Sequence, residues 1–282
     1  MHISNKGITG AYAPRWKRIM EIINAHAHIY PEKIAAKATE TIGGFYDLVP
    51  EVNTGTAQRL LEDGKRAGIS GYVVHSVATT PKQVHMINEF IKREVDAHPE
   101  FIGFITLHQD LSEDEMKAEV EWALANGMKG IKLHPDFQKF NIDGDIAEKF
   151  YRAAGNKLPI LMHMGDDRYE YSRPKKLINA AKKYPEVKFI AAHLGGYLCW
   201  DDAHLYAGVD NIYFDTCSSL PFMETEKAHA IISMLGIDRF FFGTDFPVWD
   251  ALAELERFNK IPLTEEEREM ILGKNIKRFL NI

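Results

Sequence analysis

Histidine is the residue type whose placement in this chain most directly suggests chemistry. The sequence has 12 histidines, and several of them end short apolar runs, as do one lysine and one aspartate. In chain order these residues are His26, His28, Lys132, His134, His163, His193 and Asp245. Several imidazoles and one carboxylate form a ligand set suited to zinc and similar divalent ions. The residue types therefore indicate a metal centre, provided that the fold brings them together.

Each of these residues, taken alone, also has a structural explanation. A His-x-His pair can arise by chance, and a single histidine at a strand end commonly sits in a hydrogen-bonded pocket. An aspartate before Phe-Pro is typical of a turn, and Lys132 could pair with a carboxylate inside a core. These explanations predict no common position along the strands. Because all the residues fall at strand ends, we favour the metal interpretation.

Strand geometry predicts which of these side chains share a face. Side chains alternate with a period of two, so His26 and His28 point the same way with Cα atoms roughly 6.6 Å apart. We expect Asn24 on their face and Ile23, Ala25 and Ala27 on the outward face. On the fourth strand, Lys132 and His134 share a face. The two pairs can therefore converge on one centre.

The elements that must position these residues alternate regularly along the chain. Short apolar, β-branched runs predict strands at 21–26, 71–77, 101–107, 128–134, 159–163, 187–193, 211–216 and 239–244. Amphipathic periodicity predicts helices at 82–97, 113–126, 144–154, 174–184 and 224–235, with Ser112 as an N-cap. Eight strands alternating with helices indicate a closed parallel (β/α)8 barrel, the TIM barrel, in one α/β domain. A doubly wound sheet is the second choice, since no Gly-x-Gly-x-x-Gly turn follows the first strand.

The barrel is expected to span residues 21–282, preceded by an N-terminal arm at 1–20 to which we assign no function. The last segment, 264–281, begins with Thr264 followed by three glutamates, which is typical of a capped helix. We expect this extra helix to pack outside the barrel. In such barrels the chemistry sits at the carboxyl ends of the strands. The candidate ligands lie at these ends.

Composition excludes several classes of function. Of the 282 residues 45% are hydrophobic and 26% are charged, with a net charge of −6 and no basic cluster, so nucleic acid is not an expected partner. No apolar run approaches the ~18 residues of a membrane span, and the first 19 residues do not resemble a signal peptide. Two cysteines, Cys199 and Cys217, match no disulfide framework. We therefore expect a cytoplasmic protein.

Several segments together resemble the amidohydrolase superfamily, in particular its amidohydrolase-related (amidohydrolase 2) branch of metal-dependent hydrolases and decarboxylases. The similar segments are Asn24-Ala25-His26-Ala27-His28, Gly130-Ile131-Lys132-Leu133-His134-Pro135, Leu161-Met162-His163, Ala192-His193-Leu194-Gly195-Gly196, Phe242-Gly243-Thr244-Asp245-Phe246-Pro247 and the C-terminal Ile271-Leu272-Gly273-Lys274-Asn275-Ile276. They occur in the family's order and cover 22–282.

The resemblance implies a set of functional residues. The metal ligands would be His26, His28, His163 and Asp245, and His193 would be a catalytic or second-metal residue. Binuclear members of the superfamily bridge two ions with a carboxylated lysine, and Lys132 lies at a comparable place. Many members of the amidohydrolase-related branch hold one ion. We therefore expect one zinc, with a second metal bridged by carboxylated Lys132 as the alternative.

This ligand set predicts a metal-dependent hydrolase that cleaves an amide, lactone or ester bond of a small molecule. A bound ion lowers the pKa of its water toward ~7, and Asp245 would carry the proton while His193 contacts the attacking water or the oxyanion. The alternative is a non-oxidative decarboxylase of an aromatic or unsaturated carboxylic acid, which uses nearly the same ligands. A third interpretation, a metal-storing barrel without catalysis, would not need Asp245 beside an open coordination position.

Other residues carry a weaker signal. His75 and His108 lie near the ends of the second and third strands, and Tyr197, Trp200 and Cys217 also follow strand ends. The segment 166–173 contains two arginines and two tyrosines that could hold a substrate carboxylate and a planar ring, although a solvated loop explains it as well. The expected partner is a small molecule, with a carboxylate among its expected groups. Barrel enzymes of this size often pair, so a homodimer is an expected assembly.

Overall fold

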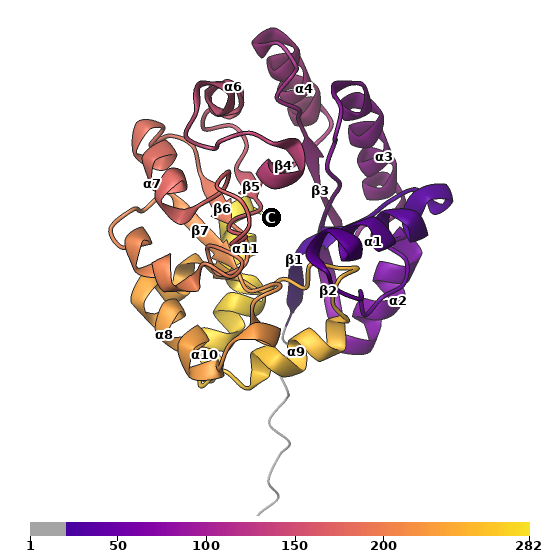
Figure 1. Ribbon diagram of the computed structural model, residues 1–282. Helices are drawn as coiled ribbons and strands as arrows, with labels where there is room; N and C mark the ends of the chain where they lie inside the picture. The colour runs from indigo at the N-terminus through magenta and orange to yellow at the C-terminus, as the bar shows by residue number, and fades with distance from the viewer. Residues whose placement is uncertain (1–20) are drawn as a thin grey trace, which may run out of the picture.

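The computed structural model describes residues 21–282, so the predicted arm lies outside the described residues. Eight parallel strands form one sheet in the order β1 to β8, with a ring of helices around them (Figure 1). The strands are β1 Ile22–His28, β2 Ile69–His75, β3 Phe101–Thr106, β4 Gly130–Leu133, β5 Ile160–Met162, β6 Phe189–Ala191, β7 Ile212–Asp215 and β8 Phe240–Phe241. The predicted TIM barrel and its eight strands are confirmed.

The barrel closes between β1 and the segment that follows β8. Ala25 N donates to Phe242 O at 2.8 Å, Asp245 N donates to His26 O at 3.0 Å, and His28 N donates to Phe246 O at 2.8 Å. Closure therefore depends on backbone that runs on past the short last strand. As a result, the backbone of Asp245 is fixed directly against the strand that carries His26 and His28.

Helices follow most of the strands, and their bounds differ in part from the expected ones. They are α1 Glu32–Tyr46, α2 Ala57–Ala67, α3 Val84–Ala97, α4 Glu113–Ala125, α5 Pro135–Gln138, α6 Asp145–Ala154, α7 Pro174–Lys183, α8 Thr225–Leu235 and α9 Ala251–Asn259. Ser112 caps α4 as predicted, through its bond from Glu115 N. The sequence did not indicate α1 and α2, and β6 is followed by a 3-10 helix, Trp200–Tyr206, instead of an α-helix.

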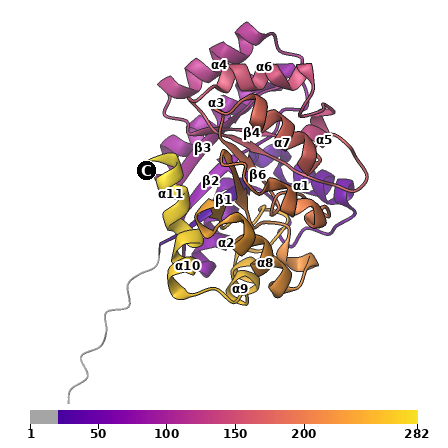
Figure 2. The ribbon, with the colours of Figure 1, turned by 90° about the vertical axis from the view of Figure 1, so that its left-hand side faces the viewer.

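The C-terminal segment begins as predicted but packs in a different place. Thr264 caps α10 Glu265–Glu269, which continues through a π-helical turn, Met270–Lys274, into α11 Asn275–Leu280. The apolar side chains of α11 pack against the inner side chains of the strands: Ile276, Phe279 and Leu280 join Ile23, Ala25, Val73, Phe104, Leu161, Ile190, Ala192 and Phe241. Figure 2 shows α11 at one end of the barrel and α1 and α5 at the other. The helix thus closes the amino-terminal end of the barrel and does not lie outside its wall.

The expected alternation of faces along β1 is wrong at two positions. Ile23 and Ala25 belong to the inner cluster beneath the site, not to the outward face. The pairing of β1 with β2 is irregular at two places, between Ile22 and Ile23 and between Asn24 and Ala27, and such irregularities change the face that the neighbouring side chains occupy. The lower half of β1 therefore supplies apolar packing, while His26 and His28 still reach the site above it.

No helix within residues 21–282 has both the length and the apolar run that a bilayer crossing requires.

The floor made by α11 should contribute measurably to stability. Leu280 is 6% exposed and Leu205, on the 3-10 helix, is 38% exposed. We expect Leu280→Ala to lower the free energy of unfolding by ~2–5 kcal/mol, because it removes buried contacts and leaves a cavity. Urea unfolding followed by circular dichroism measures this change. Leu205→Ala is the matched control, and equal losses in the two variants would contradict the packing role.

Candidate metal centre

The carboxyl ends of the strands surround a small cavity. It is lined by Ile42, Tyr46 and Phe137 together with every candidate residue of the sequence: His26, His28, Lys132, His134, His163, His193 and Asp245. Its volume is about 20 Å³, which is room for about one water molecule or one ion. Strands β1, β4, β5 and β6 and the segment after β8 therefore deliver their polar side chains to one point, as the barrel topology requires.

His26 is held between two charged groups inside the barrel. Its Nδ1 lies 2.8 Å from Asp215 Oδ2, and its Nε2 lies 2.9 Å from Lys132 Nζ. Because the carboxylate only accepts, Nδ1 carries the ring proton and Nε2 presents a lone pair. Burial raises the pKa of Asp215, but the His26 imidazole opposes this effect and the pKa lies below its usual value. A lone pair fixed by a carboxylate behind it is typical of metal-binding histidine.

Asp245 faces both histidines of β1. Its Oδ1 is 3.4 Å from His26 Nε2 and 3.5 Å from His28 Nε2. Ligand atoms bonded to one tetrahedral ion at ~2.1 Å lie roughly 3.4 Å apart, so this spacing suits a shared cation. The other oxygen, Oδ2, accepts a hydrogen bond from Ser218 Oγ at 2.6 Å, and Trp249 Nε1 donates to that hydroxyl at 2.9 Å. The carboxylate orientation is thereby fixed.

The fourth predicted ligand lines the same cavity from β5. His163 Nδ1 is 2.8 Å from His193 Nε2, while His193 Nδ1 lies 3.3 Å from the Cys217 carbonyl oxygen. Since a carbonyl only accepts, His193 is protonated at Nδ1, and His163 then donates from its own Nδ1. The remaining lone pair of His163, at Nε2, is 3.4 Å from Asp136 and 3.3 Å from the Tyr46 hydroxyl. His163 is therefore grouped with His134 and Asp136, next to the group formed by His26, His28 and Asp245.

Burial keeps these imidazoles neutral. It lowers the pKa of His28 and of His193 to about 4. Burial also lowers the pKa of His134 and His163 well below the usual value, and nearby positive charge adds to this effect. Neutral imidazole is the form that binds metal ions. The cluster therefore presents neutral nitrogen ligands that a cation could bind.

His75 strengthens the metal interpretation. It is fully buried, and neither of its ring nitrogens has a hydrogen-bond partner among residues 21–282. Its ring centroid lies 4.4 Å from that of His28 and 4.9 Å from that of His26, and the three side chains could together hold an ion. A buried polar group without a partner is destabilising by ~1–3 kcal/mol. The donor set therefore fits a divalent metal, which would give such nitrogens a partner.

The backbone at two of these residues is unusual. His193 has φ 63° and Asp245 has φ 54°, both in the left-handed region that favours glycine. Just before Asp245, a side chain at Gly243 would meet His26 Cβ at 3.1 Å. Strained residues of this kind persist only where the surroundings impose them, and they cluster at functional sites.

Several residues of the site were not recognised from the sequence. Asp215 ends β7, the same kind of position that identified Asp245, so the strand-end rule could have found it. Asp136 follows His134 at the start of α5. Tyr46, whose hydroxyl lies 2.8 Å from His134 Nε2, belongs to α1 and had no signal, because α1 itself was not expected.

The arginines of the loop 166–173 are already paired. Arg168 forms a close ion pair with Asp166 and donates to Phe45 O at the end of α1. Arg173 pairs with Glu170. His108, near the end of β3, is buried, and neither His108 nor Cys217 lines the cavity. Cys217 lies behind His26, with its Sγ 3.2 Å from His26 Nδ1 and 3.0 Å from Asp215 Oδ1.

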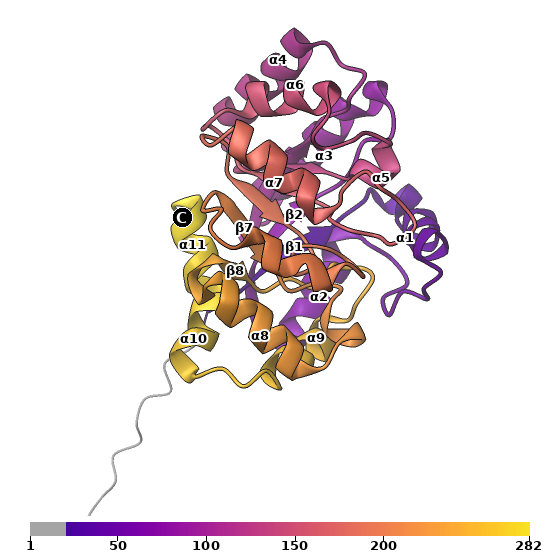
Figure 3. The same ribbon diagram turned by 60° about the vertical axis from the view of Figure 1, so that its left-hand side comes forward.

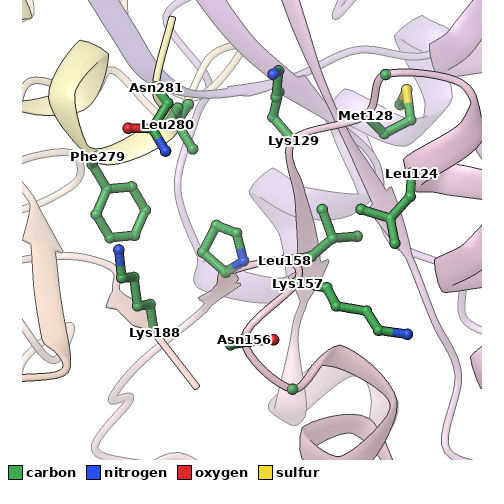
Figure 4. A pocket seen from close by; sticks show the side chains of 13 residues that line it. Leu124, Met128, Lys129, Asn156, Lys157, Leu158, Lys188, Phe279, Leu280 and Asn281 are labelled. Carbon is green, nitrogen blue, oxygen red and sulfur yellow. The ribbon is translucent and has the colours of Figure 1, made fainter. Parts of the chain in front are cut away.

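A second hollow, of about 330 Å³, lies at the other end of the barrel (Figure 4). It is formed by α11 and the loops that precede β4, β5 and β6, and Lys188 lies over the Phe279 ring with its Nζ 5.4 Å from the ring centroid. Figure 3 shows α11 on the side of the barrel away from α1 and α5. This hollow is therefore separate from the candidate metal centre.

The Asp215–His26 pair gives a prediction about metal affinity. We expect Asp215→Asn to weaken binding of a divalent ion by ~10–100-fold, because the ring loses the partner that orients it and raises its basicity. Competition with a chromophoric chelator measures the affinity. Asp210→Asn, an exposed carboxylate in the turn before the same strand, is the control. Unchanged affinity in Asp215→Asn would remove His26 from the ligand set.

Comparisons with known proteins agree with this architecture. The chain is similar in structure to 5-carboxyvanillate decarboxylase from Sphingomonas paucimobilis, with 12% identity, a TM-score of 0.71 and coverage of 93% of this chain and 99% of that one. It is similar to a dihydroxybenzoic acid decarboxylase from Polaromonas sp. JS666 that was solved with bound manganese (15% identity, TM-score 0.69, coverage 93% and 97%). A putative 2-pyrone-4,6-dicarboxylic acid hydrolase from Pseudomonas putida is also similar (14% identity, TM-score 0.66, coverage 93% and 98%).

At these identities the structural likeness shows the fold. None of the curated proteins is similar to this chain in sequence. The family described as amidohydrolase, however, matches residues 23–282, which is nearly the whole of the described chain. The resemblance drawn from the strand-end motifs is confirmed, and the chain belongs to the amidohydrolase family.

Proposed function

We propose that this protein is a metal-dependent, non-oxidative decarboxylase of aromatic carboxylic acids. This choice reverses the order expected from the sequence, in which hydrolysis came first. Two of the similar structures described above are decarboxylases of hydroxylated benzoic acids, and they match over nearly their full length. The proposal also rests on the surroundings of the candidate metal centre.

The observation that carries the proposal is the apolar approach to a buried donor set. The small cavity adjoins a larger one through His28, Ile42 and Phe137, and that larger cavity has mainly apolar walls. A carboxylate loses its stabilising water when it enters such a site, whereas carbon dioxide, a neutral product, does not need that water. Desolvation of this kind favours loss of the carboxylate. Phe137 and Ile42 offer a surface against which a planar ring could pack.

A divalent ion bound here would supply a Lewis acid that holds the carboxylate and an adjacent hydroxyl oxygen of the substrate. In the reaction the ring carbon gains a proton, its bond to the carboxylate carbon breaks, and the electron pair returns to the ring as carbon dioxide leaves. Asp245 Oδ1, which faces His26 and His28, is the proposed carrier of this proton from solvent. His193, whose Nε2 accepts from His163 Nδ1, would orient the His163 ring toward the substrate.

The identity of the ion is part of the proposal. Manganese is bound in the similar decarboxylase from Polaromonas, whereas the imidazole-rich set of this chain also suits zinc. We propose one divalent ion, with both metals to be tested. The lysine nitrogen of Lys132 lies 2.9 Å from His26 Nε2, which supports a role as an unmodified amine. A second ion bridged by carboxylated Lys132 is the alternative.

Hydrolysis is the second candidate, and the similarity to the putative 2-pyrone-4,6-dicarboxylic acid hydrolase supports it. The same donor set could lower the pKa of a bound water. We expect the manganese- or zinc-loaded protein to release carbon dioxide from at least one hydroxybenzoate in a panel, and to leave pyrone lactones intact. Carbon dioxide detection and ultraviolet spectra of ring opening measure the two activities. Lactone opening without carbon dioxide release would contradict the decarboxylase.

The proposed proton carrier can be tested separately. We expect Asp245→Asn to lower kcat by ~10²–10⁴-fold, the usual range for a general acid or base, with only partial loss of metal. Ser218→Ala, which removes the hydrogen bond to Oδ2 but keeps the carboxylate, should cause a much smaller loss. Turnover and metal content are measured on the same samples. An active Asp245→Asn variant would remove Asp245 from proton transfer.

A further inference from the structure

The cavity beside the metal centre is much larger than a simple hydroxybenzoate requires. We propose that it binds an extended apolar substituent, so that the substrate is an aromatic carboxylic acid whose ring carries an alkyl or aryl side chain. The carboxylic acid part of this inference rests on the proposed function. The apolar part rests on the cavity alone.

The two cavities adjoin each other. His28, Ile42 and Phe137 line both the small cavity of the ligands and the large one. The large cavity has a volume of about 960 Å³, near the upper end of the ~300–1,000 Å³ that small-molecule sites span. A ring held at the metal centre would therefore leave most of this volume empty. A substituent on that ring would extend directly into it.

The walls of the large cavity are apolar on both sides. Helix α1 contributes Ile34, Ala38 and Phe45, and α3 contributes Met86 and Ile87. Figure 1 shows α1 and α3 on neighbouring sides of the barrel mouth. Most of the surface that these walls present to the cavity is apolar, which favours a hydrocarbon over a polar chain.

Two of these wall residues are exposed to an unusual degree for their type. Ile34 is 52% exposed and Met86 is 63% exposed. Contiguous exposed apolar surface marks binding sites in folded proteins. The polar side chains at the rim are partly engaged already, since Gln83 Oε1 accepts from Thr79 N at 2.9 Å and Thr80 N at 3.1 Å. The charged side chains of Lys37, Lys139 and Asp136 also line the cavity, so the apolar substituent would pack against the α1 and α3 walls between them.

Binding can be tested without turnover. Resorcinols with methyl, propyl, pentyl or heptyl groups at carbon 5 resemble decarboxylation products and cannot lose carbon dioxide. We expect Kd for the metal-loaded protein, measured by calorimetry, to fall about fourfold per methylene as the chain lengthens, the factor that corresponds to ~0.8 kcal/mol. The matching 2,4-dihydroxy-6-alkylbenzoates should show the same trend in kcat/KM.

Variants of the cavity wall test whether the alkyl substituent binds in this cavity. Met86→Asp, at the cavity wall, should remove most of the gain from methyl to heptyl and weaken binding of the methyl compound much less. Met234→Asp on α8 is the matched control, because Met234 is 47% exposed and lies outside the cavity. Ala38→Trp, which fills the cavity from α1, should exclude the heptyl compound selectively.

The outcomes separate this inference from the proposed function. Affinity that does not depend on chain length would overturn the inference, even for an active decarboxylase. Chain-dependent binding without release of carbon dioxide would support the apolar site and contradict the decarboxylase. If Met86→Asp instead converted a dimer to a monomer in light scattering, with no effect on the alkyl series, the cavity would be an interface between copies and the inference would fail.

Discussion

The hydrogen bond between His26 Nδ1 and the Asp215 carboxylate joins the first strand of the barrel to the seventh at 2.8 Å, and both side chains are fully buried. Because the carboxylate cannot donate, this bond decides which ring nitrogen carries the proton and therefore which one faces the cavity. Lys132 and Asp245 both lie against that second nitrogen. If the imidazole ring were flipped, Nε2 would no longer face Lys132 and Asp245, and both contacts would be lost. The arrangement of the candidate centre thus depends on a residue that does not line the cavity.

Burial and charge act in opposite directions at this centre. Five imidazoles line one cavity, and for His28, His134, His163 and His193 burial lowers the pKa, with the nearby charge of Lys132 acting in the same direction. The carboxylates behave differently: burial raises the pKa of Asp215 and Asp245, but the surrounding imidazoles outweigh it and both pKa values lie below the usual value. Neutral nitrogen ligands beside ionised oxygens are the protonation states that a divalent cation requires.

The sequence predicted the barrel and most of the candidate centre for one reason. The strands of this chain are short apolar runs, and a polar residue at the end of such a run, as at His163 or Asp245, is easily recognised. Residues outside that pattern were missed. Helix α1 contains Gly43 and Gly44 near its end and was not recognised, so Tyr46 could not be placed. The irregular pairing at Asn24 reversed the expected face of Ala25, because a bulge depends on the neighbouring strand and not on local periodicity.

The choice of reaction could not be predicted from the motifs, since hydrolases and decarboxylases of the family share them. The residues that we propose to distinguish substrates lie on helices and have no reactive groups. Ile34 and Met86 would be read from sequence as ordinary amphipathic positions. Their importance follows only from the cavity that they line. The proposed substrate preference therefore depends on apolar residues, which sequence motifs do not include.

The left-handed backbone at His193 and Asp245 has a consequence for how this protein can evolve. Glycine or asparagine at either position would relieve unfavourable torsion angles. Selection for heat resistance alone, whether in nature or in the laboratory, would therefore tend to replace the very side chains that face the cavity. Histidine and aspartate should therefore be retained at these two positions only under selection for activity. A thermostable descendant without such selection would be expected to lose both side chains early.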